Sequence, residues 1–126
     1  MLLICIRSFF LAEPPSLGPL AFAKEVMDEG DFAQLSCIAT SGDEPLQLAW
    51  TFHGENNQIA DGIDNAMGIT TTNLGSRMSI LVIQSVQHHH RGRYTCQAKN
   101  RAGVESQSAN LKVNGKMFIL LETRVR

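Results

Sequence analysis

The sequence lacks several features that would place it in large classes of proteins. It has no Asn-x-Ser/Thr triplet, no long block of one charge and no apolar run near the roughly 20 residues of a membrane helix. We therefore expect surfaces free of N-linked glycans and no transmembrane segment. With 11 basic and 12 acidic residues, the net charge of -1 indicates neither nucleic acid nor an anionic membrane surface as a partner.

Sequence signals of catalysis are also missing. There is no Gly-x-Ser-x-Gly elbow, no phosphate-binding loop and no pair of carboxylates on opposed predicted strands, so we expect neither an enzyme nor a cofactor. The run His88-His89-His90 suggests a metal, but neighbours in an extended loop cannot all reach one ion and no acidic or thiolate ligand lies at suitable spacing. We expect no metal site, with His88 filling a corner of the fold and the other two histidines solvated.

Period-two alternation of apolar residues, broken by clusters of Gly, Asp and Asn, predicts an all-β chain of short strands. At 126 residues the chain is long enough for one domain and one core. The predicted strands are Leu20–Ala23 with a second half near Glu25–Met27, then Ala33–Thr40, Leu46–His53, Ile69–Asn73, Met78–Gln84, Gly92–Asn100 and Val104–Val113. Between them, residues 54–68 form a polar stretch with few apolar anchors.

Two cysteines, Cys37 and Cys96, bracket Trp50, and Tyr94 precedes the second cysteine by two positions. This ordered set is typical of an immunoglobulin-like antiparallel sandwich with one disulfide between its two sheets. A Cys37–Cys96 bond would close a loop of about 60 residues, worth roughly 4 kcal/mol in the chain-entropy model. It would also require an oxidising compartment, so the domain is expected to be extracellular. Cys5 lies outside this framework.

Alternation then assigns a side of the sheet to each neighbour of these residues. The residues expected to point inward, with Cys37, Trp50, Tyr94 and Cys96, are Ala33, Leu35, Ala39, Leu48, Phe52, Leu81, Ile83, Val86, Ala98, Leu111 and Val113. Four large apolar residues point outward on adjacent strands: Ile38, Met78, Ile80 and Val82. Such a patch is large for a soluble monomer and predicts a face that docks another protein. Alternatively, a neighbouring domain or a bend of the first strand covers it, or the register differs by one residue.

Several motifs resemble those of a known family. Leu81-x-Ile83-x-x-Val86, Gly92-x-Tyr94-x-Cys96-x-Ala98-x-Asn100 and Gly103 before a closing strand are similar to I-set immunoglobulin domains of adhesion receptors. Pro19-Leu20-Ala21-Phe22, Thr40-Ser41-Gly42-Asp43-x-Pro45 and Trp50-x-Phe52-x-Gly54-Glu55 look like the variable immunoglobulin domains of arthropod Down syndrome cell adhesion molecules (Dscam).

This resemblance implies a cell-surface receptor module, with alternatively spliced versions, that binds an identical copy on an apposed cell and sits among neighbouring immunoglobulin domains. In these relatives the self-contact is antiparallel and uses the face of one sheet. The matching predicted strands here are Leu20–Ala23 with its second half near Glu25–Met27, Ala33–Thr40, Met78–Gln84 and Ile69–Asn73. The corresponding candidates here are Glu25, Met27, Gln34, Ser36, Ile38, Met78, Ile80 and Val82. Where the family usually carries an aspartate that pairs with Arg77, this chain has His90, so we expect Arg77 to lose that partner.

The resemblance covers roughly residues 16–114, so the predicted domain spans 16–114 between a segment 1–15 and a tail 115–126. Segment 1–15 is either signal-like or translated from intron sequence. The tail 115–126 could likewise be translated intron. Two other functions stay open. One is a receptor domain that binds a different ligand through its loops, and the other is an intracellular structural I-set spacer with reduced cysteines.

Overall fold

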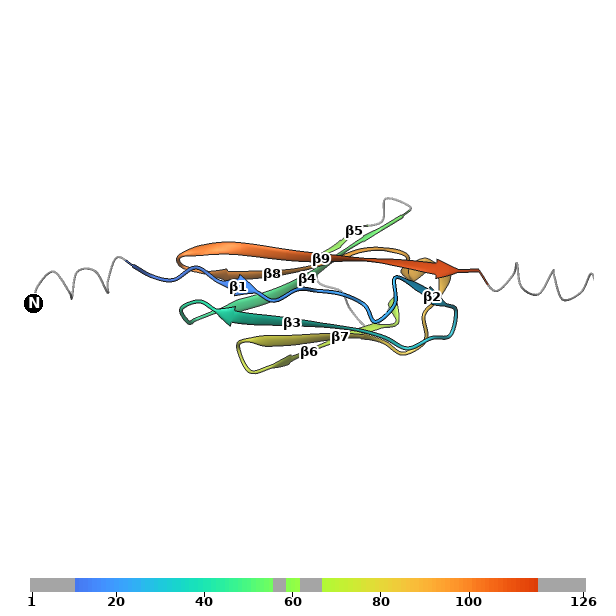
Figure 1. The fold of residues 1–126 in the computed structure, drawn as a ribbon, viewed down its shortest axis with the longest axis horizontal. Helices are drawn as coiled ribbons and strands as arrows, with labels where there is room; N and C mark the ends of the chain where they lie inside the picture. The colour runs from blue at the N-terminus through green and yellow to red at the C-terminus, as the bar shows by residue number, and fades with distance from the viewer. Residues whose placement is uncertain (1–10, 56–58, 62–66, 116–126) are drawn as a thin grey trace, which may run out of the picture.

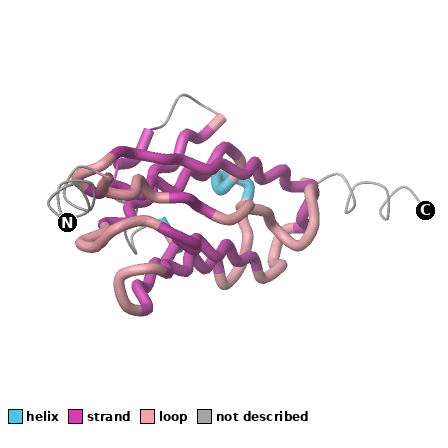
Figure 2. Tube along the Cα trace, turned by 60° about the vertical axis from the view of Figure 1, so that its left-hand side comes forward, coloured by secondary structure: helices cyan, strands magenta, loops and turns pink. Residues whose placement is uncertain are grey.

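The computed structural model of the protein describes residues 11–55, 59–61 and 67–115. Its elements pack as two layers, and the long axis runs roughly along the strands, with β1 toward one end and the end of β9 at the other (Figure 1). A tube view shows a body made mainly of strands and loops, with little helix (Figure 2). The elements are β1 (Ser16–Leu17), β2 (Val26–Asp28), β3 (Ala33–Ser41), β4 (Gln47–Gly54), β5 (Ile59–Asp61), β6 (Ile69–Leu74), β7 (Met78–Ile83), the 3-10 turn η2 (His88–His90), β8 (Gly92–Asn100) and β9 (Gly103–Asn114).

The predicted two-sheet sandwich is confirmed. Within the described ranges, one sheet has the order β1-β3-β7-β6 and the other β2-β9-β8-β4-β5. All pairs are antiparallel except β2 and β9, which run parallel. The residues expected to point inward are buried, apart from Leu48, which is half-buried. Alternation therefore placed the core correctly on the five long central strands.

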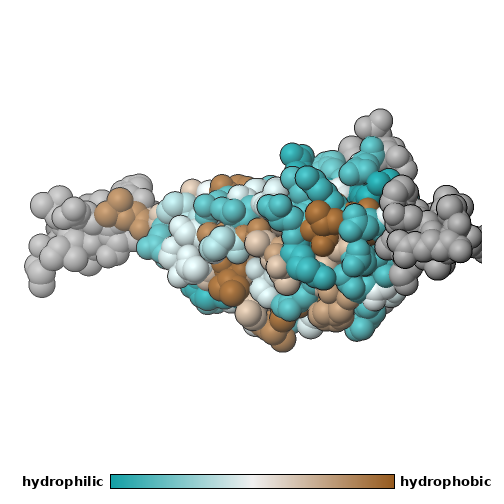
Figure 3. Space-filling view, turned by 45° about the vertical axis from the view of Figure 1, so that its right-hand side comes forward, coloured by the Kyte–Doolittle hydropathy of each residue, from teal (hydrophilic) through white to brown (hydrophobic). Residues whose placement is uncertain are grey.

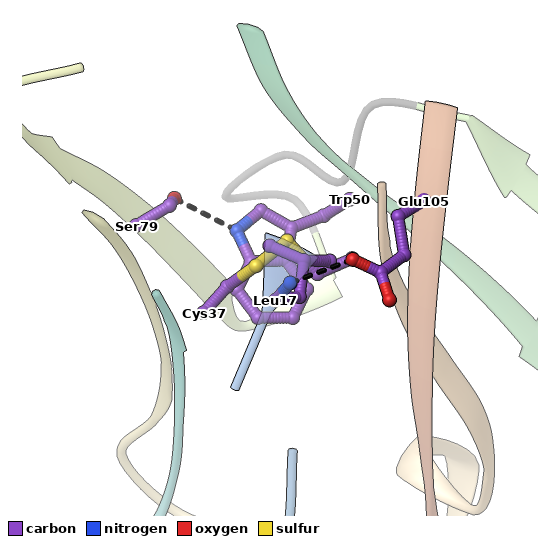
Figure 4. The surroundings of a disulfide bond; sticks show 6 residues. Leu17, Cys37, Trp50, Ser79 and Glu105 are labelled. Atoms are coloured by element: carbon purple, nitrogen blue, oxygen red, sulfur yellow. Dashed lines mark hydrogen bonds between the residues drawn. A yellow bond between two sulfur atoms is a disulfide. The ribbon is translucent and has the colours of Figure 1, made fainter. Parts of the chain in front are cut away.

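A disulfide joins the two sheets through this core (Figure 4). Cys37 of β3 bonds to Cys96 of β8 with a Cα–Cα distance of 6.3 Å, as predicted. The indole of Trp50 lies beside the sulfurs, and its Nε1–H donates to Ser79 Oγ of the opposite sheet at 2.8 Å. Because Ser79 and Trp50 are both buried, this bond satisfies the one polar atom of the indole inside an apolar core.

The N-terminal strands differ from the prediction. Residues 20–23 form no strand, and the first pairing is Ser16–Leu17 with β3. Gly18 N–H still donates to Ile38 O at 3.0 Å, but Pro19 has no N–H to continue the ladder. The chain crosses there to the other sheet, where β2 pairs with β9. A short β5 beside β4, within the polar stretch 54–68, was also not predicted.

Residues 13–15, which the sequence analysis assigned to the leader segment, lie against the sandwich. Glu13 Oε1 accepts the Gly42 N–H at 2.9 Å, and Glu13 O accepts Asn100 Nδ2 at 2.8 Å. Pro15 is buried against Gly42, whose φ of +125° suits glycine and leaves no room for a side chain. Glu13 and Pro15 thus make specific contacts with the sandwich.

The connection between β7 and β8 holds a buried histidine, and it is His90 rather than the expected His88. His90 is 1% exposed, whereas His88 and His89 are exposed. Its Nδ1 accepts the Gln87 N–H at 2.9 Å and its Nε2 lies 2.8 Å from Met67 O, which fixes the neutral Nε2–H tautomer. Burial lowers the pKa of His90 below its ordinary 6.5, with His89 acting in the same direction and the Met67 bond against it.

Tyr94 closes this corner from the core side. Its hydroxyl donates to His90 O at 2.6 Å, and burial raises the pKa of Tyr94, so the hydroxyl remains a donor. Arg77, which we expected to lose its partner, finds others: Nη2 donates to Gly42 O at 2.9 Å and Nε lies 3.6 Å from Glu44 Oε2. The arginine is therefore tied to the β3–β4 loop.

Candidate interaction face

The outer surface of the four-stranded sheet, here called the four-stranded face, carries most of the predicted interface residues. Its described outward side chains on three strands include Gln34, Ser36 and Ile38 of β3, Met78, Ile80 and Val82 of β7, and Thr70, Thr72 and Leu74 of β6. None of these nine side chains carries a charge. The charge of these nine positions therefore does not change with pH.

The strand register arranges these residues in rows across the sheet. Ile38 stands opposite Met78, which stands opposite Leu74, so one row is apolar on all three strands. Ile38 is 41% and Leu74 52% exposed, while Met78 is half-buried between them. The next rows set Ile80 and Val82 between polar residues of β3 and β6. The row therefore forms one apolar edge of the face, bordered by Ser, Thr and Gln.

Leu74 was missed by the sequence reasoning, which ended its strand at Asn73. The signal was present, because Leu74 continues the outward alternation of Thr70 and Thr72 by one more step. Two neighbouring polar residues of the face hydrogen-bond to each other: Gln34 Nε2 donates to Ser36 Oγ at 2.7 Å. The face thus presents few free polar groups beside its apolar row.

Two predicted candidates do not lie on this face. Met27 is 2% exposed, because β2 joins β9 in the other sheet and turns this side chain into the core. Glu25 is exposed beside that same sheet, and its carbonyl accepts the Lys112 N–H at 3.4 Å. After Gly18 the chain passes from the four-stranded sheet to the other sheet, so Glu25 and Met27 do not lie on the four-stranded face. The alternation of apolar residues cannot predict such a change of sheet.

No group of three or more His, Cys, Asp or Glu among the described residues could hold a metal ion. In the described ranges, no helix is long and apolar enough to cross a bilayer. In the view of Figure 3 the described surface is mostly hydrophilic, with hydrophobic residues in separate spots.

The fold, the inter-sheet disulfide with its tryptophan and the tyrosine at the β8 corner define an immunoglobulin-type sandwich. The family model described as "Immunoglobulin domain" matches residues 14–100, and the chain belongs to that family.

Among its relatives, the cell adhesion molecule Dscam1 of Drosophila melanogaster is 36% identical over 101 residues, which cover 80% of this chain and 5% of the relative. Human DSCAM is 32% identical over 96 residues, covering 75% of this chain and 4% of the relative. The chain thus spans about one-twentieth of the length of these two curated relatives.

Solved structures of single immunoglobulin domains match over nearly their whole length. The chain is similar to the crystal structure of the Dscam1 Ig7 domain, isoform 5, with a TM-score of 0.74 and 33% identity. That match covers 82% of this chain and 99% of the solved domain. The similarity to Dscam immunoglobulin domains that the motifs predicted is confirmed.

Proposed function

We propose that the chain is an extracellular module of a Dscam-like cell-surface receptor that serves cell adhesion and self-recognition by pairing with an identical copy. Its relatives are named cell adhesion molecules, and a matched solved chain holds eight immunoglobulin domains. The Cys37–Cys96 bond suits an oxidising, extracellular compartment. Neighbouring immunoglobulin domains of the parent receptor are its other expected partners.

The observation that carries self-pairing is the uncharged four-stranded face with its apolar row Ile38, Met78 and Leu74. In a twofold contact the same surface meets itself, so any charge near the axis faces its own like charge. A face with apolar and neutral residues avoids that repulsion and gains by removing its apolar atoms from water. The self-contact therefore uses Gln34, Ser36, Ile38, Met78, Ile80 and Val82, with Leu74 added from the structure.

A single domain of this kind needs only weak self-affinity. Between two membranes, many copies in parallel raise the effective concentration of each contact, so avidity supplies the strength. The antiparallel arrangement of two copies places the row of one domain across β3 and β7 of the other. Reversible dimerisation of the isolated chain is the expected solution behaviour.

Sedimentation equilibrium on the oxidised full chain tests this proposal with Ile80→Glu and a matched control. Ile80→Glu places a charge at the centre of the face, and we expect it to weaken the dimer at least about 100-fold because the carboxylate would be buried unpaired. Gln97→Glu adds the same charge to the exposed surface of the other sheet and should dimerise like the native chain. A native chain that stays monomeric, or an Ile80→Glu chain that still dimerises, would refute self-pairing through this face.

A further inference from the structure

The outer surface of the other sheet, here called the five-stranded face, has a different chemistry. Its outward side chains on β4, β8 and β9 are Gln47, Ala49, Thr51 and His53, then Arg93, Thr95, Gln97 and Lys99, then Val104, Ser106, Ser108, Asn110 and Lys112. Three are cations and none is a carboxylate. Glu105, the acid of β9, points inward and accepts the Leu17 N–H at 2.7 Å (Figure 4).

The cations form two groups at opposite ends of this surface. Arg93 stands opposite Asn110, so Lys112 is its diagonal neighbour, with Cα atoms roughly 7–8 Å apart, and His53 faces Arg93 from β4. At the other end Lys99 is followed by exposed Arg101 in the turn to β9. Arg93 and Lys99 are six residues apart on one strand, which is about 20 Å.

These four cations have no acidic partner among the described residues. The ion pairs there use Lys24, Arg77 and Arg91 instead. Adjacent like charges such as Arg93 and Lys112 repel each other, and an anion placed between them relieves that repulsion. Two acidic residues belong to the edge strands of this sheet. Asp28 of β2 stands opposite Asn114, whose Nδ2 donates to Asp28 Oδ1 at 3.0 Å, and Asp61 of β5 stands opposite Thr51.

The surface between the two groups indicates the type of anion. It presents hydroxyl and amide groups, including the pair Thr95 and Ser108, whose oxygens lie 2.8 Å apart. Its large apolar residues among the described outward positions are Val104, near one end, and Val26 on the edge strand β2, opposite Lys112. A protein partner would need apolar or aromatic anchors in the centre of the contact, and none stands there. A linear polyanion needs spaced cations and neutral hydrogen-bonding groups between them.

We propose that the five-stranded face binds a sulfated polysaccharide, laid along β8 from the Arg93–Lys112 pair to the Lys99–Arg101 pair. Sulfates contact the two cationic pairs, and sugar hydroxyls contact the Ser, Thr, Gln and Asn side chains between them. The oxidising compartment indicated by the disulfide is where such polysaccharides occur. The proposal does not rest on self-pairing, because it uses the opposite surface of the sandwich.

Isothermal titration of the oxidised full chain with a heparin dodecasaccharide tests this site. We expect binding that weakens steeply with added salt, because each contact releases counterions. Arg93→Gln/Lys112→Gln should weaken binding about tenfold or more and reduce the salt slope by about two, one for each cation removed. A matched variant, Gln84→Glu/Ser85→Glu, makes the same change of net charge at exposed positions beyond β7 and should bind like the native chain.

Three outcomes would overturn the proposal. The first is no binding of heparin at low salt. The second is an equal loss in both double variants, which would show an effect of net charge alone. The third is equally tight binding of unsulfated hyaluronan or of a polyglutamate peptide, which would show that any acidic chain suffices. Near-UV circular dichroism of each variant checks that the fold is intact.

Discussion

The two outer faces of this sandwich share one core and differ in almost every other respect. The four-stranded face has an apolar row and no charge among its described outward positions on β3, β7 and β6. The five-stranded face has cations at both ends and, on its three central strands β4, β8 and β9, neutral residues between them. The core requires apolar residues only at the inward positions of each strand. The outward positions can therefore differ between the two sheets, and each face can suit a different type of partner.

This contrast gives each face a distinct physical signature in solution. Contacts between uncharged surfaces depend mainly on apolar area and shape, whereas contacts with a polyanion depend on ionic strength. Self-pairing and polyanion binding are therefore separable by salt as well as by mutation. Because they lie on opposite sheets, one chain can make both contacts at once.

The largest expected effect comes from the loss of the Cys37–Cys96 disulfide, which lies in the core behind both faces. Replacing the disulfide by Cys37→Ala/Cys96→Ala should lower the free energy of unfolding by about 2–5 kcal/mol, because the unfolded chain regains the freedom of a long loop. Urea denaturation followed by tryptophan fluorescence measures the change. Cys5→Ala is the control, since Cys5 lies outside the predicted framework. An unchanged midpoint in the double variant would show that the bond does not stabilise the domain.

An intermediate effect separates the two faces directly. Raising NaCl from 50 to 500 mM should change the dimerisation constant less than about twofold, because the described outward positions of β3, β7 and β6 carry no charge. Heparin binding should fall by orders of magnitude over the same range. Sedimentation equilibrium gives the dimerisation constant and isothermal titration gives the heparin-binding constant, both at the same salt concentrations. A dimer as sensitive to salt as heparin binding would mean that charged residues outside the apolar row hold it together.

The smallest expected effect lies in the connection between the two sheets. The folded state favours neutral His90, so the unfolded chain binds more protons in acid. The contribution of His90 is full above about pH 6.5 and is lost as the pH falls towards the lowered folded pKa. The urea midpoint should thus drop more between pH 7.5 and 5 in the native chain than in His90→Gln. Equal drops would show that carboxylates alone cause the acid sensitivity.

The long strands could be predicted because they carry strong signals. Cys37, Trp50 and Cys96 set the inward side, and β3, β4, β7, β8 and β9 are long enough for alternation to propagate that choice. Most of the four-stranded face followed from the same step. Leu74 was missed by a single residue at a strand end, where boundaries are least reliable.

The remaining differences arise from short elements and from tertiary contacts. Strands of two or three residues, such as β1, β2 and β5, are too brief to show a period. The change of sheet after Gly18 depends on which ladder offers free hydrogen bonds, so the burial of Met27 could not be read from its neighbours. Among three identical histidines, the curvature of η2 decides that His90 points inward.

The parallel pairing of β2 with β9 also matters when the domain is stretched. The described chain runs from one end of the long axis to the other (Figure 1), so tension on the two ends acts along the strands. The three paired positions from Val26↔Lys112 to Asp28↔Asn114 then lie across the direction of pull. Their hydrogen bonds resist together in shear rather than opening one after another. A domain pulled by its two ends would therefore yield abruptly rather than gradually.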